Sequence, residues 1–359
     1  MNSTIKKVFT GGKTIPVVFA TDQNFFPYMF VAITSLIEKA SPSNNYDIVI
    51  LFDNIEEYPK QMLEKLNSKN ISIRFFNMSE IMKQYKNLWY THWLYTEAMY
   101  YRFIIPEIFK DYEKVLYLDG DIIINCDIAE LYDIDLKNNW IGAIIENSMK
   151  HPKSPAYDYI EKVLNLNKNE YFSSGVMIFN IKILSQFNFF KSCITILKNL
   201  KTPLFPDQDV LNLVCNKHVK YIDITFNLQW NILNYYKNIE NYISEKNLQQ
   251  LNDAKKNPKI LHYCGAYKPW KRPDLPYSEY FWHYARKTPF YEEFIYKNTM
   301  QTSNREIIKN AIFRRKIYFN YLRCKCLRLI TFGKTQKRYN EKTMKLKKQI
   351  QDYRKTLSK

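Results

Sequence analysis

The chain has 359 residues, of which 46% are hydrophobic, enough for one large folded domain with additional segments. Its 7 glycines exclude collagen-like and linker-like classes, and its 6 scattered cysteines show neither zinc-ribbon spacing nor a disulfide framework. The formal net charge of +18 lies mostly at one end. Residues 305–359 hold 18 Lys or Arg and 3 Asp or Glu, a net of +15, which leaves +3 for residues 1–304.

The order of these charges and apolar residues predicts three parts. They are an N-terminal extension over 1–14, a near-neutral main domain over 15–304 and a basic tail over 305–359. Residues 1–16 contain no apolar run of signal-peptide length, and no window approaches 18 uninterrupted apolar residues. We therefore expect a cytoplasmic protein without a signal peptide or a transmembrane helix.

The main domain alternates between strand and helix patterns. Helical patterns begin at Pro27, near residue 57 and at Thr96, the last of them over 96–109. Short apolar runs typical of buried strands occupy 15–21, 46–52, 71–76, 114–124, 140–145, 175–181, 219–224 and 259–264. This alternation predicts an α/β fold with a mostly parallel sheet and helices on both faces. Ligands of such sheets bind beyond the carboxyl ends of the strands.

The strongest motif is Asp119-Gly120-Asp121, within the apolar run that begins at Lys114. Residues two apart in an extended segment project to the same side, so both carboxylates can chelate one hard divalent cation. Gly120 leaves the backbone between them open to a ligand. The alternative interpretation is a pair of solvated turn aspartates, because Asp-x-Asp is common on its own.

A second candidate group follows the last strand-like run. His262 precedes a loop that contains Gly265 and Lys268. An imidazole beside two carboxylates suits Mn²⁺ better than Mg²⁺, and Lys268 can reach a phosphate oxygen. Taken alone, His262 is also explained as a hydrogen-bonded core histidine.

A third group opens a helical pattern after Pro206. It consists of Asp207, Gln208 and Asp209. Acidic residues at a helix start commonly serve as caps and interact favourably with the helix dipole. This group therefore has two open interpretations, helix capping and catalysis.

Six segments, taken in chain order, resemble glycosyltransferase family 8, the retaining enzymes that include bacterial lipopolysaccharide galactosyl- and glucosyltransferases and glycogenin. They are FATDQNF (19–25), YYRFIIPEIF (100–109), KVLYLDGDIIINCDIAELYDIDLKNNWIGA (114–143), YFSSGVMIFNI (171–181), FPDQDVLN (205–212) and ILHYCGAYKPW (260–270). The resemblance covers roughly residues 15–290, and the order of the six segments makes it specific.

This resemblance implies a GT-A catalytic domain over 15–304 that uses UDP-galactose or UDP-glucose and Mn²⁺, with Mg²⁺ as the alternative ion. It also implies a role for each matching residue. The uridine contacts would be Ala20, Thr21, Asp22 and Asn24. The contacts to the diphosphate and the sugar would be Arg102, Asp119, Gly120, Gly265 and Lys268. The metal ligands would be Asp119, Asp121 and His262, and the pair beside the anomeric carbon would be Asp207 and Gln208.

Two positions depart from the family pattern. Ser173 stands where the family often has Asn, and Glu146 stands where Asp is expected. Both would lie near the donor sugar, so the choice of hexose stays open. Glutamine is a poor nucleophile, so Gln208 favours a front-face, ion-pair-like route over a double displacement.

The basic tail mixes cations with apolar side chains. Such a segment can lie in the headgroup plane of an anionic membrane. It therefore predicts a peripheral enzyme at the inner membrane face. An enzyme in that position is expected to act on a lipid-linked or other cell-surface glycan acceptor. Residues at 346, 350, 353 and 357 recur at helical spacing. A solvated tail without a partner is the alternative, and we expect no nucleic-acid partner because no known nucleic-acid module accompanies it.

Two rival functions have to be weighed against a transferase. One is a haloacid dehalogenase-like phosphohydrolase with Asp119 as its nucleophile, although that motif normally lies on the first strand of such enzymes. The other is a catalytically silent, membrane-bound scaffold, which the complete set of metal-ligand candidates argues against.

Overall fold

The computed structural model describes residues 4–91, 96–200, 203–230, 233, 235–299, 315–316, 319–320, 322–323, 326–327 and 333–356. Their contacts divide the chain into two compact units, Met1–Tyr291 and Glu292–Lys359. The expected domain boundary at residue 305 lies outside the described residues.

The first unit is built on a sheet of seven strands. They are β1 (Thr14–Thr21), β2 (Asn45–Phe52), β3 (Ile71–Asn77), β4 (Lys114–Leu118), β6 (Ile141–Ile145), β7 (Phe172–Asn180) and β8 (Val219–Tyr221). Their order is β3-β2-β1-β4-β7-β6-β8, and β7 runs antiparallel to both of its neighbours while the other pairings are parallel. Continuous apolar runs form β1 and β2 because both faces of these strands are covered.

A second sheet joins three short strands, β5 (Ile122–Ile124), β10 (Ile260–His262) and β9 (Leu228–Gln229), in that order. The single strand expected over 114–124 is therefore wrong. Its two halves belong to different sheets, and Asp119, Gly120 and Asp121 form the crossing between them. The apolar pattern continues through both halves because each strand is buried in its own sheet.

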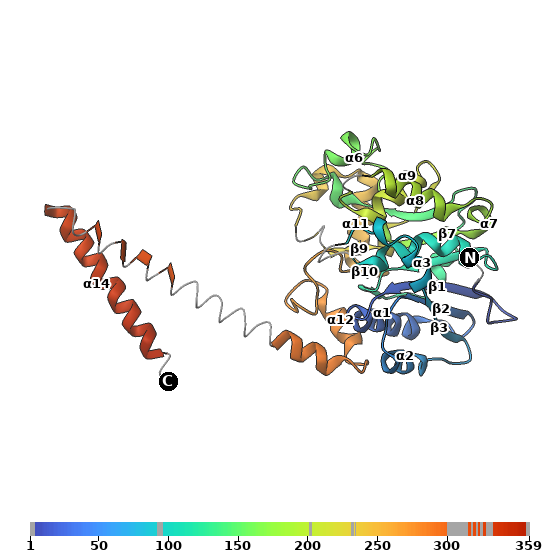
Figure 1. The fold of residues 1–359 in the computed structure, drawn as a ribbon, viewed down its shortest axis with the longest axis horizontal. Helices are drawn as coiled ribbons and strands as arrows, with labels where there is room; N and C mark the ends of the chain where they lie inside the picture. Colours follow the sequence, from blue (N-terminus) through green and yellow to red (C-terminus); the bar gives the residue numbers. More distant parts are fainter. Residues whose placement is uncertain are drawn as a thin grey trace. The chain divides into compact units, whose positions relative to one another are not determined.

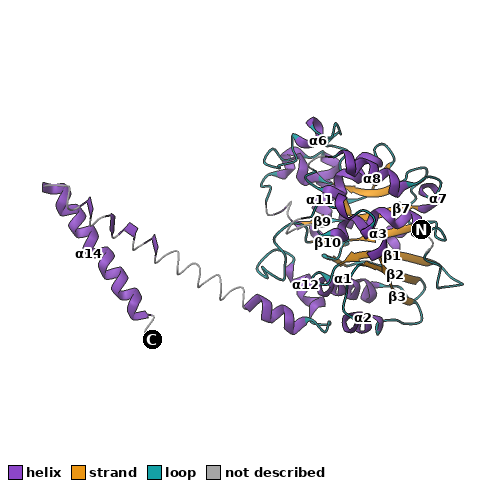
Figure 2. Ribbon diagram, in the orientation of Figure 1, coloured by secondary structure: helices purple, strands orange, loops and turns teal. Residues whose placement is uncertain are grey.

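Helices surround the sheets, as Figures 1 and 2 show. The helices of the first unit are α1 (Phe26–Lys39), α2 (Glu57–Glu64), α3 (Ser79–Lys83), α4 (Ile105–Ile108), α5 (Ala129–Tyr132), α6 (Tyr159–Lys162), α7 (Ile181–Leu184), α8 (Phe189–Asn199), α9 (Pro206–Val214), α11 (Glu245–Lys256) and α12 (Ser278–Ala285). Single 3₁₀ turns occupy η1 (Lys86–Leu88), η3 (Asn147–Lys150), η4 (Ile224–Phe226) and η5 (Ile239–Tyr242), and a longer 3₁₀ segment forms η2 (Glu97–Ile104).

The helix expected over 96–109 is thus a 3₁₀ segment, η2, followed by one α-helical turn, α4. Pro106 lies in the first turn of α4, where its missing N–H is not needed. In the middle of one continuous α-helix the same proline would remove a hydrogen bond. The break places Arg102 at the buried end of η2, with 4% of its surface exposed.

In the second unit, α14 extends over Gly333–Thr356 and confirms the expected helical tail. Among the described residues, no helix has the length and apolar content needed to cross a bilayer.

The packing of α4 against α8 encloses the carboxyl group of Glu107. The backbone N–H of Phe190 donates to Glu107 Oε1 at 2.7 Å, while Oε2 has no hydrogen-bond partner in the described part of the chain. Burial raises the pKa of Glu107 from 4.5 to about 7, and the hydrogen bond from Phe190 opposes this shift only in part.

Replacement of Glu107 by glutamine should remove a pH-dependent loss of stability. Between pH 4.5 and about 7 the folded state holds a proton on Glu107 that the unfolded state has released, so stability falls as the pH rises. We expect Glu107→Gln to reduce the difference in unfolding free energy between pH below 4.5 and pH above 7 by about 3 kcal/mol. Denaturant unfolding at both pH values measures this change. Glu64→Gln, an exposed control in α2, should change nothing, and equal behaviour of the two variants would contradict the assignment.

Candidate active site

The carboxyl ends of β1 and β4 and the beginning of β7 meet at one edge of the large sheet. Phe19 of β1 pairs with Leu118 of β4, and Leu118 pairs with Val176 of β7. The Asp119 N–H donates to the carbonyl of Gly175 at 2.8 Å. Because β7 is antiparallel, its first residues, rather than its last ones, reach this edge.

Asp119, Asp121 and His262 form one cluster at this edge. One ligand atom from each lies within 4.8 Å of the others. His262 Nε2 is 3.3 Å from Asp121 Oδ1 and 3.7 Å from Asp119 Oδ2. The pairing of β10 with β5 holds His262 opposite Ile122, directly after Asp121. These three predicted ligands are therefore together, with two oxygen donors and one nitrogen donor facing one space.

The other ring nitrogen of His262 is fixed by Asn227. Its Nδ1 lies 2.8 Å from Asn227 Oδ1, and a carbonyl oxygen only accepts, so Nδ1 carries the proton. Nε2 is then the ring nitrogen that faces the two carboxylates. This outer contact is the usual means by which a metal-binding imidazole is oriented.

Two glycines leave room around the cluster, in different ways. A Cβ on Gly175 would clash with the His262 ring and lie 2.6 Å from Asp119 Oδ2. A Cβ on Gly120 would instead lie 3.0 Å from Met29 Cβ of α1. Gly120 thus allows close packing against α1, whereas Gly175, which the sequence did not indicate, keeps the space between the predicted ligand side chains.

Arg102 links two of the acidic groups. Its Nη2 lies 2.8 Å from Asp119 Oδ1 and its Nη1 lies 3.0 Å from Asp207 Oδ2. The guanidinium also stacks on the ring of Tyr117, with Cζ 4.2 Å from the ring centroid. Burial lowers the pKa of Arg102, but the negative charges of Asp119 and Asp207 outweigh it, so this pKa lies above its ordinary value.

Lys268 supplies positive charge to the other aspartate. Its Nζ donates to Asp121 Oδ2 and, at 2.7 Å, to the carbonyl of Tyr263. Burial raises the pKa of Asp121, but the charges of Lys268 and His262 act against it and hold this pKa below its ordinary value. Asp121 is therefore ionised near neutral pH.

The polar residues at the start of α9 make two different kinds of contact. Asp209 Oδ2 accepts from the N–H of Phe205, the residue before the helix, so Asp209 is the carboxylate that turns back to the helix start. Asp207 instead accepts from the hydroxyl of Ser174 at 2.9 Å, and Gln208 Oε1 accepts from the Ser174 N–H at 3.0 Å. Burial raises the pKa of Asp207, and the charge of Arg102 opposes that shift.

The expected uridine contacts leave the sheet beside this cluster. Ala20 and Thr21 end β1, and Asp22 Oδ1 accepts from the Phe25 N–H at 2.9 Å. Asn24 is exposed. Gly265 follows β10 with a φ of +80°, a conformation that favours glycine. These residues thus follow β1 and β10, the strands that pair with β4 and β5 on either side of Asp119 and Asp121.

A polar chain that the sequence did not predict adjoins the cluster. Gln229 Nε2 donates to Glu146 Oε2 at 2.5 Å and lies 3.1 Å from Ser173 Oγ. Both positions that depart from the family pattern are thus joined through one amide. Burial raises the pKa of Glu146, and hydrogen bonds from Ser148 and Gln229 oppose the shift. A glutamine at the end of a two-residue strand carries no local sequence signal.

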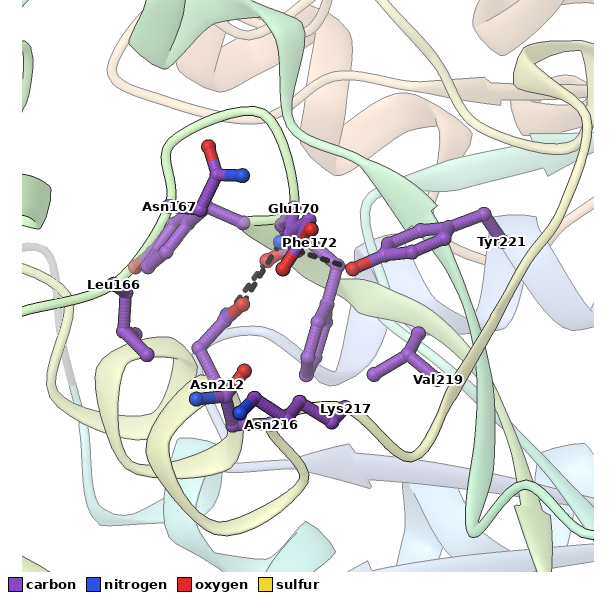
Figure 3. Close-up of a pocket in the computed structure, with 10 residues that line it drawn as sticks. Leu166, Asn167, Glu170, Phe172, Asn212, Asn216, Lys217, Val219 and Tyr221 are labelled. Atoms are coloured by element: carbon purple, nitrogen blue, oxygen red, sulfur yellow. Dashed lines mark hydrogen bonds between the residues drawn. The ribbon is translucent and has the colours of Figure 1, made fainter.

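Figure 3 shows a small pocket to which α9, β7 and β8 contribute residues. It is lined by residues that include Asn167, Tyr171, Asn212, Lys217 and Tyr221. None of the expected donor or metal contacts lines it. The chemistry of the candidate site therefore lies at the strand edge and not in this pocket.

Substitution of Gly175 by alanine should weaken metal binding. The added methyl group would push the His262 ring away from Asp119, and we expect Mn²⁺ affinity to fall by about 100-fold. Titration followed by electron paramagnetic resonance measures the free ion. Gly11→Ala is the matched control because a methyl group added there would have no atom within 4 Å. A folded Gly175→Ala protein with unchanged Mn²⁺ affinity would contradict this account.

The chain is similar to several known glycosyltransferases. The Lipopolysaccharide 1,3-galactosyltransferase of Salmonella typhimurium is 28% identical over 286 residues, which cover 76% of this chain and 78% of that protein. Among solved structures, the galactosyltransferase LgtC in complex with donor and acceptor sugar analogs has a TM-score of 0.64 and 25% identity, with 77% of this chain and 96% of that chain covered.

The bifunctional glycosyltransferase WbbM, in its apo form, has a TM-score of 0.71 and 28% identity over 83% of this chain. This chain spans only 53% of the length of WbbM. The GT-A fold is confirmed by these structures, and the alternative of a haloacid dehalogenase-like phosphohydrolase is wrong. Residues 16–274 match the description Glycosyl transferase family 8, so the chain belongs to this family of glycosyltransferases.

Proposed function

We propose that the protein transfers galactose or glucose from a UDP-sugar to a glycan acceptor, with retention of the anomeric configuration. The observation that carries this proposal is the convergence of the ligand set Asp119, Asp121 and His262 with two cations, Arg102 and Lys268. Such a site suits a diphosphate that binds through a divalent ion and develops negative charge as it leaves.

The donor set fits a metal ion of intermediate hardness. Two carboxylates and one imidazole favour Mn²⁺, with Mg²⁺ as the alternative. A divalent cation bound there would act as a Lewis acid toward the diphosphate. Lys268 would bind a phosphate oxygen, and Gly265 would let the backbone approach it. Ala20, Thr21, Asp22 and Asn24 would hold the uridine at the end of β1.

The environments of Asp207 and Gln208 support a front-face route. The Asp207 carboxylate is held by Arg102 and Ser174, which lowers its strength as a nucleophile. The Gln208 carbonyl accepts from the backbone of Ser174. Both groups are therefore suited to stabilise an oxocarbenium-like sugar electrostatically, and neither has the freedom that attack on the anomeric carbon requires.

The acceptor in this proposal is a lipopolysaccharide, a lipooligosaccharide or another cell-surface glycan. The name of the Salmonella typhimurium relative supports this class. Ser173 and Glu146, joined by Gln229, are the residues we assign to the choice between the two hexoses.

The tail unit suits an anionic membrane surface at the cytoplasmic face. Helix α14 carries 9 Lys or Arg and 2 Asp or Glu. Exposed apolar side chains accompany these charges, among them Phe319 and Met344. An interfacial segment combines these two properties, and each cation near an anionic leaflet contributes on the order of 1 kcal/mol.

Release of UDP tests the transferase. With Mn²⁺, we expect slow hydrolysis of UDP-galactose or UDP-glucose, which a chelator abolishes and Asp121→Ala reduces by about 100-fold or more. The Asp253→Ala variant changes an exposed aspartate in α11 and should retain the wild-type rate. The donor that is hydrolysed identifies the sugar.

Absence of donor turnover and of donor binding would contradict the proposed function. If neither donor is turned over, and if UDP with Mn²⁺ does not raise the melting temperature, the proposed function is wrong. The silent scaffold would then be the remaining interpretation.

Charge reversal in the tail tests membrane binding in the full chain. The triple variant changes Lys345, Lys347 and Lys348 to glutamate, and we expect its affinity for phosphatidylserine-containing vesicles to fall by at least about tenfold. Sedimentation with vesicles measures the bound fraction. The control reverses three exposed lysines of the first unit, Lys69, Lys198 and Lys256, and has the same net charge. An equal loss in both variants would show that the tail has no special part in binding.

A further inference from the structure

Three aromatic side chains from two loops meet beside the active site. The ring centroids of Trp230 and Tyr235 are 5.7 Å apart, those of Trp230 and Tyr267 6.2 Å, and those of Tyr235 and Tyr267 5.2 Å. Trp230 is 2% exposed, whereas Tyr235 and Tyr267 are 43% and 42% exposed. A buried indole thus supports two tyrosine rings that face solvent. We call these three residues the aromatic platform.

Both loops are anchored in the strands of the active site. Gln229, which precedes Trp230, pairs with His262 between β9 and β10. Tyr267 directly precedes Lys268, whose ammonium group donates to Asp121. The platform therefore adjoins both the Glu146–Gln229–Ser173 chain and the cation that would hold the diphosphate.

The loop of Tyr235 is held in place from its other side. The ring of the next residue, Tyr236, lies 5.0 Å from the imidazole of His151, and Tyr242 meets the same imidazole edge-on at 4.8 Å. His151 is 5% exposed. Asn238 adopts a left-handed φ of 62°, which turns the chain between these contacts. The segment that directly follows Tyr235 is thus anchored by its own contacts.

The chemistry of this surface matches a sugar ring. One face of a pyranose presents C–H groups with partial positive charge, which pack against the negative face of an aromatic ring. The rim of the same sugar presents hydroxyl groups, which need polar partners such as the adjacent carboxylate and amide groups. The roles proposed above for the donor use no member of the platform.

We propose that the aromatic platform binds the sugar ring of the acceptor and orients it toward the donor. This inference rests on the proposed transferase function. It assigns Trp230 as the support and Tyr235 and Tyr267 as the contact rings. The acceptor class it selects is a glycan whose terminal pyranose has an open C–H face, such as a β-galactoside or a β-glucoside.

Saturation-transfer NMR tests the platform directly. Methyl β-galactoside and methyl β-glucoside serve as probes, with UDP and Mn²⁺ present so that the donor site is occupied. We expect saturation of the C–H protons of one ring face for at least one probe. In Tyr235→Ala and Tyr267→Ala this signal should fall by about tenfold, and in Tyr267→Phe, which keeps the ring, it should persist.

A second measurement follows the reaction itself. In the two alanine variants, the fraction of donor sugar transferred to the glycoside rather than to water should fall by about tenfold. Tyr58→Ala removes a tyrosine that is 70% exposed in α2 and should leave both measurements unchanged. Melting temperatures of all variants confirm that they are folded.

The outcomes separate the two proposals. If wild-type protein binds and hydrolyses the donor but shows no saturation transfer to either glycoside, or if the alanine variants bind the glycosides as the wild type does, the platform assignment is wrong. If donor binding and hydrolysis are both absent in the wild type, the transferase proposal itself fails. Signals lost only when UDP is omitted would still support the platform, because the acceptor site would then require the donor side to be filled.

Discussion

The arrangement of the active site depends on pairing three carboxylates, two of them buried, with two cations. Asp121 and Asp207 are largely enclosed, and Asp119 lies between them. Unpaired charges in such surroundings cost several kcal/mol each, so the edge would not be stable with aspartates alone. Arg102 bridges Asp119 and Asp207, and Lys268 holds Asp121. The same cations that allow the acidic groups to gather are those suited to a diphosphate.

The direction of one strand determines which residues reach that edge. Because β7 is antiparallel to β4, Ser174 and Gly175 lie at the carboxyl end of β4 rather than at the far side of the sheet. Ser174 then bonds with both Asp207 and Gln208, and Gly175 makes room for His262. The neighbouring second sheet brings His262 and Gln229 to the same place.

The resemblance to family 8, and not spacing along the chain, predicted that His262 would join Asp119 and Asp121. Local patterns predicted the α/β class and the positions of most strands, because these depend on residues close in sequence. They did not predict Gln229 or Gly175, since those positions acquire meaning only through the pairing of distant strands. The error over 114–124 has the same origin, because an apolar run does not specify which sheet each half joins. Asp207 and Asp209 could be separated only by seeing which one turns back to the helix start.

The crossing between the two sheets and the loop after β10 differ in how far their sequences can change without disturbing the metal-ligand residues. Only Asp119, Gly120 and Asp121 separate β4 from β5, so the flanking residues lie at most about 14 Å apart and an inserted residue would change the spacing of the two carboxylates. In the loop after β10, Lys268 is paired with Asp121, whereas the preceding Tyr267 is largely exposed and has no part in that pairing. Natural variation and directed evolution can therefore rebuild the surface offered to new acceptors while the spacing of the metal ligands stays the same.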